Sequence, residues 1–365
     1  MKIFIDCTDT YFSGLNTGIQ RVVRNFTKHT ILLGPTMGLE CTPVIMRDST
    51  LLAITSIDDP SMKKPRHTLR SLLNNVYFST SRILATTFPF PSFQRFLLAH
   101  RSQFGLAWLL FSPLQSVAWL RSLGKSHRPL VKGIEDTLEK GDIFFLPDAS
   151  WTLDTFDLLK KVKTNGGHIV FFVHDIIPLT HPQVYHPVHV KRFREWFWQI
   201  VQISDILICN SHFTQKSVLA YLNQQSDISP PISAVIHLGY DLGPLPSGDI
   251  HHSRLRLALI KSSANFLCVG TLEPRKNLDI LIDAFEALWN EQHKVSLILI
   301  GRAGWLCEDL LTRIRRHPEQ GKQLFWFSDV GDTDLTLAYQ KASALIFPSI
   351  VEGFGLPLVE ALRQE

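Results

Sequence analysis

Several features that would place this 365-residue chain in a special class are missing from its sequence. Its five cysteines lie far apart and form no Cys-x-x-Cys pair. Neither a zinc knuckle nor a disulfide framework is therefore indicated, and a reducing, cytoplasmic setting fits. The amino-terminal apolar run is interrupted by Asp6, which is not typical of a signal peptide. The most apolar stretch, 104–120, contains Ser, Pro and Gln and falls short of the roughly 20 apolar residues that a membrane span needs.

Acidic residues are absent from 60–134, a stretch that contains eleven Lys and Arg. Because the whole chain has a formal net charge of +4, the remainder is net acidic. The basic stretch is also rich in Leu, Phe and Trp. We predict that it forms an insertion in the first domain, with helices at 69–84, 93–103 and 105–123. Basic, aromatic and apolar residues together favour an anionic membrane surface over nucleic acid as the partner.

Length and alternating patterns predict two α/β domains. Short apolar runs bounded by turn residues read as strands, and the segments between them carry helical stripes. From Tyr240 to Gly248 the composition shifts to Gly, Pro and Ser, which indicates a domain boundary. We therefore predict a first domain over 1–240, a linker over 241–264 and a second domain over 265–365. The predicted strands are Lys2–Cys7, Asp142–Pro147, His168–His174, Ile206–Cys209, Ala234–His237, Phe266–Val269, Val295–Ile300, Leu324–Phe327 and Ala344–Phe347.

The first strand leads through a glycine loop into a helix with an apolar stripe, and Arg21 lies on the other side of this helix. A strand, a glycine loop and a helix form the usual entry to a nucleotide-binding α/β domain, in which Gly18 would lie near a phosphate. The residues alone also fit a plain strand-to-helix turn, because no dinucleotide-binding fingerprint is present.

His174 and Asp175 follow a predicted strand, at the end of a parallel sheet where ligands bind in open α/β folds. His174 could equally cap the end of that strand. Three further histidines, His181, His186 and His189, invite a metal site, but they lie on a proline-interrupted segment without the spacing of a helical zinc motif. We therefore expect no metal. The aromatic segment that follows, 191–203, is expected to be a core helix.

In the second domain, Arg275 and Lys276 lie between a predicted strand and the amino terminus of the next helix. Two cations and the positive end of a helix dipole suit a diphosphate. The alternative is that both charges are simply solvated on a loop.

The most informative stretch runs from Phe347 to Glu360. Here a buried strand passes through a glycine turn into a helix, with Glu352 in the turn and Glu360 one turn into the helix. The glycines allow the backbone to approach a ligand closely, and carboxylates accept hydrogen bonds from sugar hydroxyls. This arrangement suits an anionic, polyhydroxylated ligand.

The frame Phe-Pro-Ser-x-x-Glu-Gly-Phe-Gly-Leu-Pro at 347–357, with seven residues between its two glutamates, resembles the retaining glycosyltransferases of family 4, which have the GT-B fold. Gly-Thr-Leu-Glu-Pro-Arg-Lys-Asn at 270–277 resembles the diphosphate-binding loop of that family. The phrase Thr-Gly-Ile-Gln-Arg-Val-Val at 17–23 is similar to the amino-terminal loop of a subgroup that makes O-antigen and exopolysaccharide, which includes mannosyltransferases.

The resemblance implies two Rossmann-like domains that face a cleft, and a role for each matched residue. His174 and Glu352 would contact the transferred sugar. The other matched residues would bind the phosphates, sugar, base and ribose of the sugar-nucleotide donor. They are Gly18, Arg275 and Lys276 for the diphosphate, Gly353, Phe354 and Gly355 for the sugar, Val330 for the nucleobase edge, and Glu360 for the ribose.

Family members continue beyond the helix at 356–365 with further strands and helices, so we expect the second domain to be incomplete. The resemblance implies transfer of a hexose, most simply mannose from GDP-mannose, to a lipid-linked saccharide at the inner membrane face, without a cofactor. Two other classes stay open, namely an inactive truncated remnant and a basic peripheral module that binds anionic membranes through 60–134.

Overall fold

The structure of the chain is a computed structural model. It describes residues 1–13, 17–47, 50–54, 57, 138–149, 156–225, 230–239 and 250–364. The predicted basic helices between 60 and 134 lie outside these residues.

The first sheet has seven strands in the order β3-β2-β1-β4-β5-β6-β7. All neighbours are parallel except the edge pair of β2 and β3. The chain moves outward from β1 to β2 on one side and later to β4 on the other, which makes the β1–β4 boundary a topological switch point. The strands are β1 (Lys2–Asp6), β2 (Glu40–Arg47), β3 (Thr50–Ala53), β4 (Ile143–Leu146), β5 (His168–Val173), β6 (Ile206–Cys209) and β7 (Ile232–Val235).

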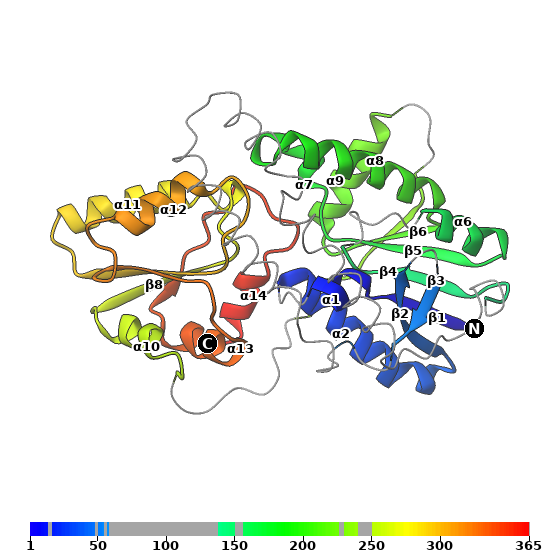
Figure 1. Ribbon diagram of the computed structural model, residues 1–365, viewed down its shortest axis with the longest axis horizontal. Helices are drawn as coiled ribbons and strands as arrows, with labels where there is room; N and C mark the ends of the chain where they lie inside the picture. Colours follow the sequence, from blue (N-terminus) through cyan, green and yellow to red (C-terminus); the bar gives the residue numbers. More distant parts are fainter. Residues whose placement is uncertain are drawn as a thin grey trace, which may run out of the picture.

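Apolar helix faces cover this sheet (Figure 1). The main core includes Phe144 and Phe171 from the sheet and Phe193 and Phe197 from α8, all buried. This confirms that the aromatic segment is a core helix. The described helices of the first domain are α1 (Thr8–Ser13), α2 (Gly18–Leu33), η1 (Gly34–Met37), α6 (Phe156–Thr164), α7 (Ile177–Thr180), η5 (Pro182–Val184), α8 (Pro187–Ile203) and α9 (His212–Asn223).

The second sheet is parallel, in the order β10-β9-β8-β11, with helices on both faces. Side chains of α10 and α13 pack on one face, and those of α11 and α12 pack on the other. Its elements are α10 (Ser253–Ile260), β8 (Ala264–Val269), η6 (Pro274–Lys276), α11 (Leu278–Asn290), β9 (Val295–Ile300), α12 (Glu308–Arg316), β10 (Leu324–Phe327), α13 (Asp332–Lys341), β11 (Ala344–Leu345) and α14 (Leu356–Leu362). The predicted α/β class with two Rossmann-like sheets is confirmed.

Some predicted boundaries are wrong. The helix predicted from Lys191 begins at Pro187, where proline suits the first helical position and the His186 side chain accepts from the Val188 amide. Strand β11 ends at Leu345, two residues before the predicted end at Phe347. The antiparallel pair β2 and β3 was not predicted, because Pro43 and charged residues obscure its alternating pattern.

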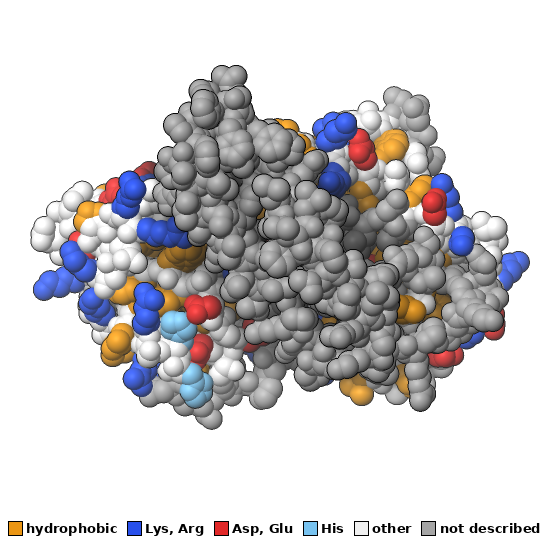
Figure 2. Space-filling view, in the orientation of Figure 1, with side chains coloured by type: hydrophobic (Ala, Val, Ile, Leu, Met, Phe, Trp, Pro, Cys, Tyr) orange, Lys and Arg blue, Asp and Glu red, His pale blue; other side chains and the backbone are white. Residues whose placement is uncertain are grey.

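The stretch 241–264, predicted as a linker, contains α10, whose Leu255 and Leu259 are buried in the core of the second domain. We propose that the second domain begins at or before Ser253. Figure 2 shows Lys and Arg side chains spread over the described surface of this domain on the face in view, interspersed with Asp, Glu and His. Among the described residues, none of the helices has both the length and the hydropathy required to cross a membrane.

Candidate functional site

The loop after β11 leaves the second sheet and reaches the carboxyl ends of β5 and β6 in the first domain (Figure 1). Its Gly353 carbonyl accepts hydrogen bonds from Ser211 Oγ at 2.6 Å and Thr214 Oγ1 at 3.2 Å. A Cβ atom on Gly353 would lie only 2.2 Å from the His174 carbonyl oxygen. Asn210 Nδ2 donates to that same carbonyl at 2.6 Å. Only glycine fits this position, because the two backbones touch directly.

The residues after Gly353 continue this contact between the domains. Phe354 and Leu356 pack against an apolar cluster of the first domain, and the Phe354 ring lies 6.1 Å from the His237 ring. Gly355 has φ of +91° and precedes α14, a left-handed conformation that favours glycine. A Cβ on Gly18, at the start of α2, would lie 3.2 Å from Leu356 Cδ1. The predicted positions Gly18 and 353–355 therefore come together from opposite ends of the chain.

Glu352 binds Arg275 and Lys276, the two cations of the 270–277 loop that were predicted to bind a diphosphate. Its Oε2 lies 2.5 Å from Arg275 Nη1, and its Oε1 lies 2.5 Å from Lys276 Nζ. Burial alone would raise the pKa of Glu352, but the two adjacent cations outweigh it and hold that pKa below its usual range. The two cations therefore belong to one buried charge cluster, and they are not solvated charges on a loop.

Within this cluster, Arg275 is held on several sides. Its Nε lies 2.5 Å from the buried Glu273 carboxylate, and its Nη1 also donates to the Val351 carbonyl at 3.4 Å. Burial raises the pKa of Glu273 to about 7, against the opposing effect of Arg275. The Ile350 amide donates to the Arg275 carbonyl at 2.8 Å. Arg275 thus orders the Glu352 turn in addition to any contact with a phosphate.

His174 directly follows β5, and its backbone carbonyl is the one that contacts Gly353. Its Nε2 lies 2.7 Å from the Pro147 carbonyl oxygen. Burial lowers the pKa of His174 to about 4, although the bond to Pro147 opposes the shift. At neutral pH the ring is therefore uncharged, and because a carbonyl can only accept, Nε2 carries the proton. Nδ1 is then a hydrogen-bond acceptor, which suits a sugar hydroxyl.

Glu360 lies in α14 and has different partners from Glu352. Its Oε1 forms an ion pair with Arg21, and its Oε2 accepts from Tyr339 Oη at 2.8 Å. Only 2% of Glu360 is exposed. The two glutamates of the motif are thus each paired with their own cations, which the sequence did not predict. Arg21 was missed as a site residue, since its place on the polar side of α2 resembles an ordinary solvated face.

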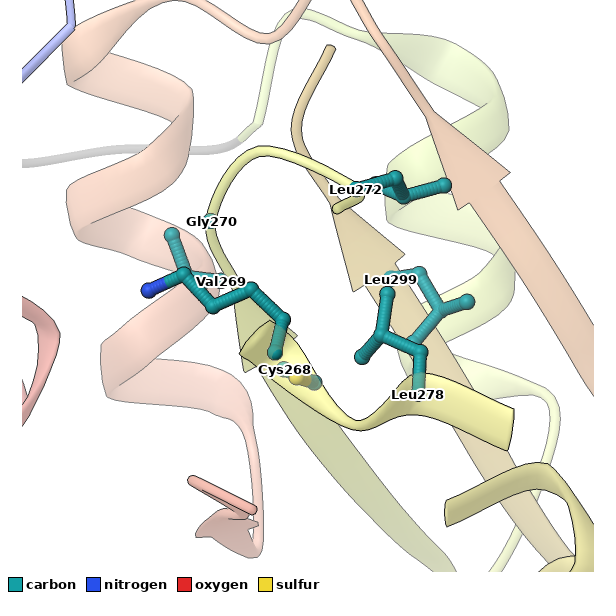
Figure 3. Close-up of a pocket in the computed structure, with 7 residues that line it drawn as sticks. Cys268, Val269, Gly270, Leu272, Leu278 and Leu299 are labelled. Atoms are coloured by element: carbon teal, nitrogen blue, oxygen red, sulfur yellow. The ribbon is translucent and has the colours of Figure 1, made fainter. Parts of the chain in front are cut away.

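Val330 lies between β10 and α13, half-buried against the core of the second domain. A pocket behind the diphosphate loop is lined by seven residues, and its labelled side chains are apolar (Figure 3). This pocket belongs to the packing of β8 against α11, because its only charged lining residue is Lys276.

Two carboxyl groups at the topological switch point were not predicted. Asp6 at the end of β1 and Asp148 just after β4 are both buried. The Thr8 amide donates to Asp6 Oδ1 at 3.0 Å, and the Thr10 amide donates to Asp148 Oδ2 at 2.8 Å. Burial, with the repulsion between the two groups, raises the pKa of Asp6 to about 7, and burial raises that of Asp148 to about 6.

The part of the chain that the structure describes contains no group of three or more metal-ligand side chains. His186 immediately precedes α8 and His189 lies in its first turn, with ring centroids 5.9 Å apart. His181 Nδ1 lies 2.9 Å from Thr180 Oγ1.

Two family models match parts of the chain. The model of "Glycosyl transferases group 1" matches residues 253–365, and that of "Glucosyltransferase 3-like, N-terminal domain" matches residues 115–221. The first match covers the whole second sheet with α10, and the second covers β4, β5 and β6.

Among curated relatives, the serotype-specific mannosyltransferase WbdA of Escherichia coli is 31% identical over 265 residues, which are 70% of this chain and 32% of WbdA. The O-antigen chain mannosyltransferase B of Escherichia coli is 28% identical over 259 residues, 70% of this chain and 62% of the relative. The chain thus spans less than two thirds of either protein.

Among solved structures, Anabaena Alr3699/HepE in complex with UDP-glucose aligns with all of this chain and 78% of its own, with a TM-score of 0.53 and 16% sequence identity. At this identity the likeness concerns the fold alone. Two Rossmann-like domains joined through the Glu352 turn agree with it.

Proposed function

Because this chain belongs to the group 1, family 4-like glycosyltransferases with the GT-B fold, we propose that it transfers a hexose from a nucleoside diphosphate sugar to a growing glycan. One observation carries the proposal. The Glu352 turn joins Arg275 and Lys276 of the second domain to the end of β5 in the first. This contact brings the cations to which we assign the diphosphate close to the groups to which we assign the sugar.

In this proposal each site residue has a separate role in the transfer. Lys276 and Arg275 neutralise the negative charge that develops on the leaving diphosphate, which lowers the barrier without a metal ion. Glu352 and the 353–355 backbone orient the sugar, and neutral His174 accepts a hydrogen bond from one sugar hydroxyl through Nδ1. Gly18 allows close approach of the donor to the start of α2.

Several finer features belong to the same proposal. The donor is GDP-mannose, supported by relatives named as O-antigen mannosyltransferases. The reaction retains the anomeric configuration, as the family resemblance implies. The acceptor is a lipid-linked saccharide, and the basic stretch 60–134 holds the protein on an anionic membrane at the inner face. Glu360 and Val330 contact the ribose and the nucleobase edge.

Calorimetric titration of UDP- and GDP-sugars tests the donor site. Changing Arg275 and Lys276 together to Ala removes two charge-assisted contacts of roughly 1.5–3 kcal/mol each, so affinity should fall by about 100-fold or more. Lys276→Gln alone, which leaves Arg275 on Glu352, should lose about tenfold.

The matched control changes Arg316 and Lys322, two exposed cations of the same domain, to Ala. It should bind donor as the unmodified protein does. Unchanged donor affinity in both Lys276 variants, with a native circular dichroism spectrum, would contradict the assignment. Failure of the unmodified protein to bind any nucleotide sugar would leave the inactive remnant or the membrane module as its function.

A further inference from the structure

One ion pair joins the two domains at the carboxylate to which we assign the ribose. Arg21 in the first turn of α2 pairs through Nη2 with Glu360 Oε1 in α14, across 339 residues of sequence. The Arg21 side chain is 20% exposed and that of Glu360 is 2% exposed. Figure 1 shows α14 between the two lobes, beside the helices at the amino terminus.

Glu360 is anchored on both sides of the domain boundary. Within its own domain, the buried Tyr339 of α13 donates to Oε2 at 2.8 Å. From the other domain, Arg21 supplies the cation. A carboxylate this deeply buried needs a compensating charge, because desolvation disfavours an isolated ion. Arg21 can supply that charge only while the two domains are together.

The backbone that carries Arg21 is held in place. Thr17 and Gln20 form a capping box at the start of α2, and Gln20 Nε2 also donates to Asp9 Oδ2 at 3.1 Å. Gly18 lies against Leu356 of the other domain. The first turn of α2 is thus ordered by its own side chains and presents Arg21 toward α14.

Other contacts across the boundary give the closed arrangement a definite geometry. Trp305 Nε1 donates to the Val184 carbonyl at 3.0 Å, and the Trp305 ring stacks on Tyr185 with centroids 5.0 Å apart. These contacts lie beside Val351 in the glutamate turn, which packs with Val184 and Tyr185. Arg21 acts at the separate point where α2 meets α14.

We propose that Arg21 is a positioning residue that couples closure of the two domains to the orientation of Glu360. The proposal rests on the proposed function, in which Glu360 accepts hydrogen bonds from the ribose hydroxyls of a nucleoside diphosphate sugar. When the domains separate, Glu360 loses its cation and its fixed orientation, so the ribose is held firmly only in the closed enzyme.

The kinetic test uses Arg21→Gln, Arg21→Lys and Lys28→Gln, the last being an exposed cation of the same helix. Loss of one charged contact should raise the donor KM by about 10- to 100-fold in Arg21→Gln. The acceptor KM should hardly change. Lysine at position 21 should recover most of the donor affinity, and Lys28→Gln should match the unmodified enzyme.

Small-angle scattering tests the coupling without donor. Arg21→Gln should increase the radius of gyration, and the charge exchange Arg21→Glu with Glu360→Arg should restore the compact value. The exchanged variant should still fail to bind donor, because its position 360 can no longer accept from the ribose.

An unchanged radius of gyration and donor KM in Arg21→Gln would overturn the inference. An equal rise of donor and acceptor KM would also overturn it, since a merely structural defect affects both. Failure of the unmodified protein to bind any nucleotide sugar would instead refute the proposed function, and scattering would still report on the ion pair.

Discussion

Replacing Gly353 with Ala should separate the glutamate turn from the first domain. The added Cβ would lie 2.2 Å from the His174 carbonyl oxygen and 3.1 Å from Asp175 Cβ, whereas ordinary contacts begin near 3.4 Å. Backbone lies on both sides of the closest contact, so no side chain can rotate away. The turn must therefore move by about 1 Å to bring this approach back to an ordinary van der Waals distance.

The cost follows from the contacts that such a shift breaks. Overpacking costs roughly 1–3 kcal/mol. The hydrogen bonds from Ser211 and Thr214 to the Gly353 carbonyl, at 2.6 and 3.2 Å, would be lost as well. At about 1 kcal/mol each, they bring the total to roughly 3–5 kcal/mol. The docked arrangement should then weaken by a factor of about 100 or more.

Hydrogen exchange of the 350–356 amides and the turnover of donor sugar together measure this effect. Gly353→Ala should exchange faster in that segment and should lose transfer activity by a similar factor. Gly239→Ala is the matched control, because its Cβ would meet nothing within 4 Å. If Gly353→Ala showed the protection and the activity of the unmodified protein, the tight contact with His174 would not govern the site.

Two further predictions concern pH and salt. Because burial and Asp148 raise the pKa of Asp6 to about 7, the folded protein binds more protons than the unfolded chain between roughly pH 4 and 7, and the free energy of unfolding should fall as pH rises through that window. Asp6→Asn should flatten this dependence in urea denaturation of the first domain, and an unaltered slope would exclude Asp6 as its source. Binding to anionic vesicles through 60–134 should weaken steeply with added salt, since each Lys or Arg near the surface contributes about 1 kcal/mol. Equal sedimentation with neutral vesicles would show that the charge is incidental.

Local pattern was sufficient for most of the fold. The second domain shows this well, because Leu278, Leu281, Ile282 and Phe285 repeat at helical spacing and are buried on α11. Strands such as β9 are easily recognised in the sequence as continuous apolar runs, because both faces of a parallel sheet are covered. Strand β2 lies inside the sheet and was missed because Pro43 and charged residues interrupt its pattern, and the edge strand β3 has only 4 residues.

For the candidate site, local pattern predicted the residues, and the tertiary structure decided their partners. Local pattern predicted Arg275 and Lys276 as a diphosphate site and Glu352 with Glu360 as a separate pair of carboxylates, and only the family resemblance placed them at one ligand. Which cation pairs with which carboxylate was decided only by the tertiary structure. Arg21 and Glu360 are 339 residues apart, and no local periodicity relates them.

The amino-acid sequence by itself therefore determined the elements, the two sheets and the chemical character of the loops, because each depends on neighbours within one or two turns. The tertiary structure decided the contact of Gly353 with His174, the ion pair of Arg21 with Glu360 and the raised pKa of Asp6. These depend on how closely two separately folded surfaces approach and how much water they exclude, which no single segment encodes.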